Sequence, residues 1–386
     1  MKFITADKIY TGKVVLENKV VVINAANTVI DIVEAKNIDS SQVETFEGVL
    51  CPGFINAHCH VELSHLFGKV SEKMGLDNFI KEIELYRKAD ESGILDAIKI
   101  SDQEMYSNGI VAVGDICNTA NTFGRKLDSK ISYHNFLEVF AFHPSRAEHV
   151  YEQGLKLFHL SQQPSSITPH APYSASEKLL KLISDFAIEN SSVLSIHNQE
   201  TEDENLMFQS KTGKVIERIK GFGIETDFWN APQENSIVAT LKQLPKQLKI
   251  QLVHNTFTSE ADMLWANEYN KNLYWCFCVN ANKYIENRIP NIPLFIKNNC
   301  KITIGTDSLA SNWSLNILDE LKTISNAYSE ISLQQLIQWS TINGAEYLGF
   351  DRNLGSIEIG KTPGINLISN IENNQLTKKS EVVKIV

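Results

Sequence analysis

Eight short apolar segments, separated by longer amphipathic stretches, most strongly constrain how this 386-residue chain can fold. Two of the intervening stretches, 78–87 and 176–190, have the apolar spacing of helices that cover a sheet. Strands that alternate with helices form parallel sheets, and eight such units predict a closed (β/α)8 barrel. The predicted strands are 53–56, 110–113, 136–140, 166–168, 193–196, 250–253, 274–277 and 302–304.

The two ends of the chain differ from this middle part, because both consist of short β-branched runs. We expect strands from the two ends to pair, since chain termini often lie close together. The predicted fold class is α/β: a TIM-like barrel over 51–350 and a composite β-sandwich from 1–50 and 351–386. The N-terminal runs, read as a small antiparallel sheet, and the C-terminal runs are 13–16, 20–23, 28–33, 354–361, 365–369 and 381–386.

Composition limits the function classes. The apolar fraction of 43% allows a large buried core, and the net charge of -10 disfavours nucleic-acid backbones and anionic membranes as partners. We find neither a secretory signal nor an apolar stretch of the roughly 20 residues that span a bilayer, so we expect a cytoplasmic protein. Six cysteines are too few for a disulfide scaffold. Oligomeric state stays open, with a homodimer as one alternative.

Histidines gather where the predicted strands end. The chain has 10 histidines, and five of them fall at these ends, which chance placement does not explain. Barrel enzymes carry their chemistry at the carboxyl ends of the strands, so these side chains should face one another. In chain order, the histidines and one carboxylate at strand ends are His58, His60, His170, His197, His254 and Asp307.

A metal site follows from this placement. His58 and His60 are two residues apart in an extended segment, so both imidazoles point to the same side. With His197 and Asp307 they supply three imidazoles and one carboxylate, a set that suits one Zn²⁺, with Fe²⁺ as the alternative. One position stays open for a water molecule, whose pKa the cation lowers toward neutrality.

Three further groups are expected to work beside the metal. Glu200, three residues after His197, can take a proton from the water and deliver it to a leaving group. The alternative for Glu200 is a solvated loop residue in an acidic run. His254 is expected to orient the attacking oxygen, and Asp307 counts as catalytic as well as a ligand. His170 is expected to face the substrate.

The ordered set of motifs resembles the amidohydrolase superfamily, and within it the single-metal branch of guanine, adenosylhomocysteine and aminodeoxyfutalosine deaminases. The resemblance implies the ligand set and roles given above, together with the companion β-sandwich. Two-metal members carry a lysine on strand four, and 165–170 has none, which implies one metal. The motifs are Pro52–His60, Thr168–Ser174, Ile196–Thr201, His254 and Gly305–Ser308.

Three positions depart from the family pattern. The Pro-x-Ser-Asn motif after strand seven reads Val279–Asn282, in which only Asn282 matches, and Asn282 is expected to bind substrate. Glu62 stands where many relatives have an apolar residue, and it is predicted either to contact the ribose or amine of a substrate or to support the site. The tail at 360–364 also differs, far from the chemistry.

The resemblance implies a metal-dependent hydrolytic deaminase that acts on the C–NH2 amidine carbon of a nitrogen heterocycle and releases ammonia. The expected substrate is a 6-aminopurine nucleoside, such as aminodeoxyfutalosine or an adenosine derivative. One alternative is a hydrolase of the same fold that acts on a formimino group, a cyclic amide or an aryl chloride. A metal-free scaffold is the remote alternative, and it would lack metal ligands that this chain retains.

Overall fold

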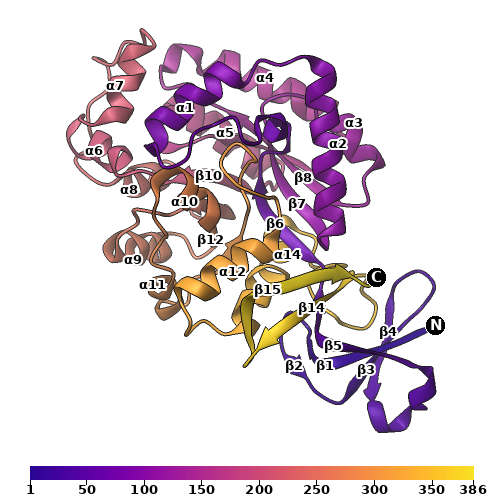
Figure 1. Cartoon of the computed structure of the whole chain (residues 1–386). Coiled ribbons are helices and arrows are strands. Elements are labelled where there is room, and N and C mark those ends of the chain that lie inside the picture. Colours follow the sequence, from indigo (N-terminus) through magenta and orange to yellow (C-terminus); the bar gives the residue numbers. More distant parts are fainter.

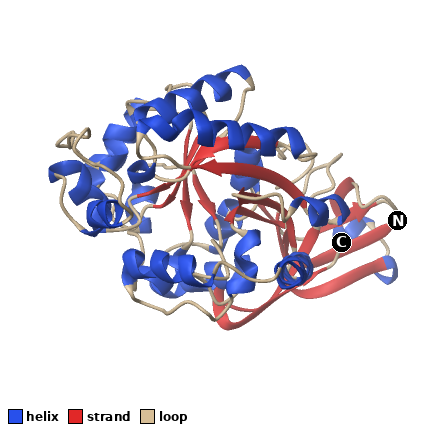
Figure 2. Cartoon of the chain, turned by 90° about the horizontal axis from the view of Figure 1, so that it is seen from above, coloured by secondary structure: helices blue, strands red, loops and turns tan.

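The structure is a computed structural model that describes all of residues 1–386. A barrel makes up most of the molecule, and a smaller sheet that holds both termini lies beside it (Figure 1). Seen from above, helices surround the converging barrel strands, and the terminal sheet extends away from them (Figure 2). The predicted fold class, a barrel with an accessory unit from both ends, is confirmed.

The barrel contains eight parallel strands in two hydrogen-bonded groups of four, in the orders β6-β7-β8-β9 and β10-β11-β12-β13. The groups meet on one side where the Thr168 hydroxyl bonds to the backbone of Ser195, and on the other through a bridge between Cys59 and Asp307. All eight predicted strands are confirmed: β6 Phe54–Cys59, β7 Ile110–Cys117, β8 Ser132–Val139, β9 Ser165–Pro169, β10 Leu194–Asn198, β11 Ile250–His254, β12 Leu273–Phe277 and β13 Ile302–Ile304.

Helices cover the outside of the barrel and extend over its carboxyl end. The two predicted helices correspond to α1 and α5, and the α5 face that carries Leu179, Ile183 and Phe186 is buried against the barrel. The helices are α1 Gly75–Tyr86, α2 Glu91–Ser107, α3 Phe123–Asp128, α4 Ala147–Leu160, α5 Glu177–Glu189, α6 Glu202–Ser210, α7 Lys214–Gly221, α8 Ser236–Leu241, α9 Glu260–Tyr269, α10 Val279–Glu286, α11 Ile292–Lys297, α12 Ile317–Ala327, α13 Leu333–Trp339 and α14 Ile342–Leu348.

The terminal unit is a seven-stranded sheet in the order β15-β14-β5-β1-β3-β4, with β2 paired to β1. It has its own apolar core, in which Ile4, Val21, Leu50 and Ile365 pack together. The strands are β1 Lys2–Tyr10, β2 Val15–Leu16, β3 Lys19–Ile23, β4 Val29–Glu34, β5 Val43–Pro52, β14 Ile365–Glu372 and β15 Gln375–Lys384.

Two details of the predicted terminal unit are wrong. The runs 20–23 and 28–33 pair antiparallel as predicted, but the sheet as a whole is mixed, because β1 and β5 run parallel to each other. The segment 354–361 forms turns instead of a strand. Gly355 and Gly360 have φ values of 82° and 92°, which an extended strand does not allow. The predicted domain limits at 50 and 351 stay a prediction.

The helices are all too short or too polar to cross a lipid bilayer.

Candidate active site

Three histidines and one aspartate converge at the carboxyl end of the barrel. His58 and His60 come from the end of β6, His197 from β10, and Asp307 from the loop after β13; all four are buried. The Nε2 atom of His60 lies 3.2 Å from Nε2 of His58, 3.3 Å from Nε2 of His197 and 3.3 Å from Oδ1 of Asp307. The structure therefore brings together the four predicted ligands.

This cluster has the dimensions and chemistry of a metal site. Ligand atoms bound tetrahedrally at about 2.1 Å from one ion stand about 3.4 Å apart, close to the separations observed. Burial lowers the pKa of His58 to about 4 and that of His60 to about 3, so both imidazoles are neutral and keep a free lone pair. The group fits a single divalent cation.

Hydrogen bonds behind the cluster fix which atom of each ligand faces the centre. Nδ1 of His197 lies 2.8 Å from the backbone oxygen of His170 and donates to it, which leaves Nε2 unprotonated. The Ser311 hydroxyl donates to Oδ2 of Asp307 at 2.5 Å, so Oδ1 is the atom left for a cation. The orientation of these ligands is therefore set by their surroundings.

Two residues of the site have left-handed backbone conformations. His254 has a φ of 73° and Asp307 a φ of 57°, values that cost a non-glycine residue roughly 1–2 kcal/mol each. His254 is the last residue of β11 and Asp307 lies three residues after β13, where the chain turns from a strand into a loop. Strain of this kind is typical of positions where a side chain must point to one place.

Glu200 and His254 lie beside the cluster and face each other. Glu200 sits in the loop between β10 and α6, and its Oε1 is 3.6 Å from Nε2 of His254. Burial raises the pKa of Glu200 to about 8, so its carboxyl group holds a proton at neutral pH. This arrangement places a proton donor next to the predicted metal.

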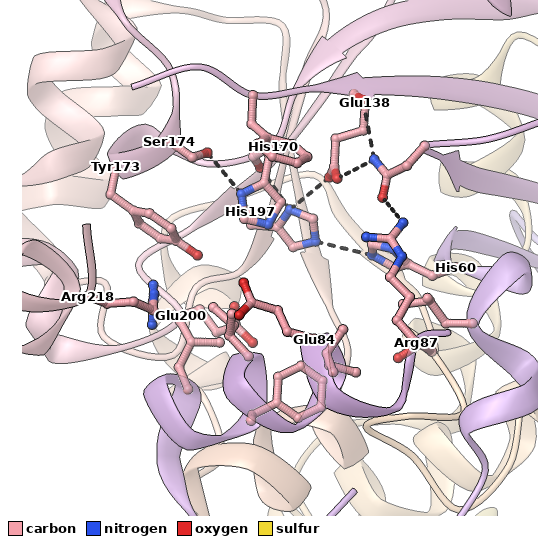
Figure 3. A pocket seen from close by; sticks show the side chains of 18 of the residues that line it. His60, Glu84, Arg87, Glu138, His170, Tyr173, Ser174, His197, Glu200 and Arg218 are labelled. Atoms are coloured by element: carbon pink, nitrogen blue, oxygen red, sulfur yellow. Dashed lines mark hydrogen bonds and ion pairs between the residues drawn. The ribbon is translucent and has the colours of Figure 1, made fainter. Parts of the chain in front are cut away.

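The cluster lies at one end of a cavity of about 310 Å³. Figure 3 shows His60, His197 and Glu200 on its wall, with His170 and Tyr173 nearby. The opposite walls are largely apolar and come from α1, α7 and the loop after β8. The apolar side chains include Leu76, Phe79, Ile80, Ile83, Phe140, Phe142 and Ile219. Such a cavity suits a flat, partly apolar ligand.

Glu62 and Asn282 do not line this cavity. For Glu62 this favours the supporting role over substrate contact, and the substrate contact of Asn282 stays a prediction. Glu62 lies in a 3-10 turn, Val61–Leu66, which ends the strand alternation and turns the side chain away. Both its carboxylate oxygens are hydrogen-bonded, to Arg87 at 3.0 Å and to the loop at Thr119. Asn282 instead accepts a hydrogen bond from Nδ1 of His254 at 2.8 Å. Both residues support the site from behind.

Several cavity residues were not predicted. Glu138, at the end of β8, was overlooked although a lone acid inside the apolar run 136–140 is a recognisable signal. Arg218, on α7, has its guanidinium 5.7 Å from the centre of the Tyr173 ring. Nothing in the sequence around Arg218 indicates that an inserted helix brings it to the barrel mouth.

The barrel, the cluster of imidazoles and carboxylate, and the buried acid beside it define a class of barrel hydrolases. The chain belongs to the amidohydrolase family: the model of that family matches residues 49–386. The protein is therefore a hydrolytic enzyme of this family.

Comparisons with individual proteins agree with this assignment. The chain is 26% identical to an aminodeoxyfutalosine deaminase of Nitratiruptor sp., over 95% of this chain and 91% of the relative. The structure of Helicobacter pylori aminofutalosine deaminase with methylthio-coformycin has a TM-score of 0.82 and 22% identity, covering 98% of this chain and 94% of that one. A zinc-bound adenosine deaminase from Xanthomonas campestris has a TM-score of 0.72 and 17% identity, covering 95% and 84%. The two structures show the shared fold.

Proposed function

We propose that this protein is a zinc-dependent deaminase of a 6-aminopurine nucleoside, an adenosine derivative whose amino group is released as ammonia. The full-length similarity to a deaminase that acts on such a nucleoside supports this substrate class. The bound zinc of a protein with the same fold supports the choice of metal. The observation that carries the proposal is that the four predicted ligands converge on one point and that Glu200 and His254 line the cavity beside them.

His58, His60, His197 and Asp307 would hold the ion. A divalent cation there supplies Lewis-acid chemistry: it polarises a water molecule and lowers its pKa toward neutrality. Net hydrolysis exchanges the amino group of the ring carbon for the oxygen of water, so the products are a ring carbonyl and ammonia. The protein's own residues must therefore supply and remove protons.

Glu200 is placed to move these protons. Its proton, retained at neutral pH by burial, passes to the ring nitrogen beside the reacting carbon and makes that carbon more electrophilic. Glu200 then accepts the first proton that the attacking water loses and passes it to the departing amine. The second proton of that water returns to Glu200 as the ring carbonyl forms, which restores the starting state. His254, 3.6 Å from Glu200, directs its Nε2 into the same space and orients the attacking oxygen.

Replacement of Glu200 tests this mechanism. We expect Glu200→Gln to lower kcat for ammonia release from adenosine or 5′-deoxyadenosine by roughly 10²–10⁴-fold, because general acid–base catalysis is lost. Bound zinc, measured by elemental analysis, should stay near that of the wild type. Glu148→Gln, an exposed substitution on α4, serves as the control. Substantial activity in Glu200→Gln would contradict the assigned role.

Metal removal tests the cofactor. Chelation should abolish ammonia release and lower the melting temperature, because the ligands are buried and the ion binds only the folded chain. One equivalent of Zn²⁺ should restore both properties. Full restoration by Fe²⁺ with none by Zn²⁺ would overturn the choice of metal, and unchanged activity after complete chelation would overturn the metal dependence.

A further inference from the structure

One acidic oxygen in the cavity has no partner. Glu138 stands at the end of β8, is 6% exposed and lines the same cavity as the predicted metal ligands. Its Oε1 atom is buried and makes no hydrogen bond. Leaving a buried acceptor unsatisfied costs about 1–3 kcal/mol, and more when the group is charged. A donor that arrives with the ligand would remove this cost.

The other oxygen of the same carboxylate, Oε2, is fixed by a hydrogen bond. Oε2 of Glu138 accepts a hydrogen bond from the Asn118 side-chain amide at 3.0 Å. The amide oxygen of Asn118 in turn accepts from Arg87 at 3.0 Å, and Arg87 is paired with Glu62 at 3.0 Å. Figure 3 shows this connection from Arg87 to Glu138. The network fixes Glu138 and leaves Oε1 as the carboxylate oxygen without a hydrogen bond.

A second metal ion does not explain the free oxygen. One possible ligand atom from each of Glu138, His170 and His197 lies within 4.8 Å of the others, which is close enough for a second metal site. However, Nδ1 of His197, 3.6 Å from Oε1 of Glu138, already donates its proton to the backbone oxygen of His170. A protonated ring nitrogen cannot bind a cation. The partner of Oε1 must therefore be a hydrogen-bond donor.

The position of Glu138 indicates which part of a ligand lies there. Glu138, Arg87 and Asn118 line the cavity with the metal cluster and also an adjoining cavity of about 310 Å³. The adjoining cavity is bordered by Phe142 and Leu157. Glu138 thus lies where the two spaces meet. A nucleoside whose base occupied the first cavity would extend its ribose toward this junction.

We propose that Oε1 of Glu138 accepts a hydrogen bond from one ribose hydroxyl of the substrate, and that this contact makes the enzyme selective for hydroxylated nucleosides. The inference rests on the proposed deaminase function. Because one oxygen of Glu138 has no hydrogen bond, Glu138 can bind one hydroxyl of the substrate. A site built to hydrogen-bond a hydroxyl strongly rejects an analogue that lacks it, since the buried acceptor is then left unpaired.

The test compares adenosine with its 2′-deoxy, 3′-deoxy and 2′,3′-dideoxy analogues in the zinc-loaded wild type. We expect the dideoxy compound to lose at least about 100-fold in kcat/KM. Exactly one of the monodeoxy compounds should show the same loss. Equal turnover of all four compounds would overturn this inference and leave the proposed function intact. No ammonia from any of them would overturn both.

Glu138→Gln adds the protein side of the test. The variant should have a kcat/KM for adenosine about 100-fold below that of the wild type, and a kcat/KM for the dideoxy analogue within about 3-fold of the wild-type value. The preference for adenosine over the dideoxy analogue should therefore disappear. An equal loss with both substrates, together with reduced bound zinc, would show that Glu138 only supports His197 and would overturn the proposal. Glu84, an exposed acid of α1 that lines the same cavity, is the other residue that could bind the hydroxyl. Loss of selectivity in Glu84→Gln alone would also overturn the proposal.

Discussion

His254 shows at the scale of one residue how a side chain is prepared by a partner that never reaches the cavity. Its Nδ1 donates to Oδ1 of Asn282 at 2.8 Å, and the Asn282 amide donates back to the His254 backbone oxygen at 3.3 Å. This pair of bonds fixes both the ring orientation and its tautomer. The Nε2 atom is left as the acceptor that faces Glu200.

Removal of that partner should therefore impair turnover rather than binding. We expect Asn282→Ala to lower kcat by about 10–100-fold with little change in KM, because His254 can then adopt the wrong tautomer or rotate. Kinetics with adenosine, together with zinc content, measure this effect. Asn298→Ala, at the residue that follows α11, is the control. A raised KM with normal kcat would instead indicate that Asn282 contacts the substrate.

Site residues could be predicted from the sequence where they lie on a barrel strand or directly at its end. His58 and His60 were found because alternation along a strand and the common end of parallel strands bring such residues together. For Glu62 the sequence left two roles open, because the alternation stops at His60, where a 3-10 turn begins. Glu138 was missed because its role depends on its hydrogen bond with Asn118 and on its place in the cavity wall, and no local sequence pattern indicates either.

At the scale of elements, α12 connects helix α10, which carries Asn282, to the loop that carries Asp307. The buried Glu320 of α12 accepts from the backbone N–H of Asn280, at the start of α10, at 3.0 Å. It also accepts from the side-chain amide of Asn312 at 2.8 Å, in the loop that follows Asp307. Burial raises the pKa of Glu320 to about 8, so the folded protein keeps this carboxyl protonated at neutral pH.

The raised pKa of Glu320 predicts a pH-dependent stability. Between its ordinary value of 4.5 and about 8, the unfolded chain loses this proton while the folded protein retains it. Stability from this group is therefore full below pH 4.5 and is lost as pH rises to about 8, by at most about 1.4 kcal/mol per pH unit. Glu320→Gln cannot titrate, so its unfolding free energy should fall less over this range.

Denaturant unfolding at pH 5, 6.5 and 8 measures the difference between wild type and Glu320→Gln. The unfolding free energy of Glu320→Gln should increase steadily relative to that of the wild type as pH rises. The exposed substitution Glu330→Gln should follow the wild type at every pH. Parallel curves for all three proteins would show that Glu320 ionises normally in the folded state.

Elements with a strong apolar pattern were predictable, and elements defined by their neighbours were not. All eight barrel strands were found because each is buried on both faces and reads as an apolar run. β1 and β5 were missed because Lys2–Tyr10 and Val43–Pro52 mix charged and apolar residues on a half-exposed sheet. The other neighbour of β5 is β14, more than 300 residues away along the chain.

At the scale of the whole molecule, one carbonyl joins the barrel to the terminal sheet. The backbone oxygen of Gly109 accepts from the N–H of Phe54, the first residue of β6, at 2.8 Å. It also accepts from the side chain of Asn366, on β14, at 2.9 Å. Asn366 is fully buried. The contact lies at the amino ends of the barrel strands, opposite the metal cluster, where barrel residues serve stability rather than chemistry.

Asn366→Ala should therefore destabilise the protein by about 1–3 kcal/mol, because a buried hydrogen bond is lost, and leave kcat/KM per folded molecule unchanged. Gly109→Ala should also destabilise it, since Gly109 has a φ of 79° and a Cβ would lie 2.4 Å from the Asn366 amide. The space left by Asn366→Ala relieves that clash, so the double variant should be more stable than the sum of the single losses predicts. Thermal unfolding and ammonia release measure both properties; strictly additive losses would mean that the two side chains do not share this space.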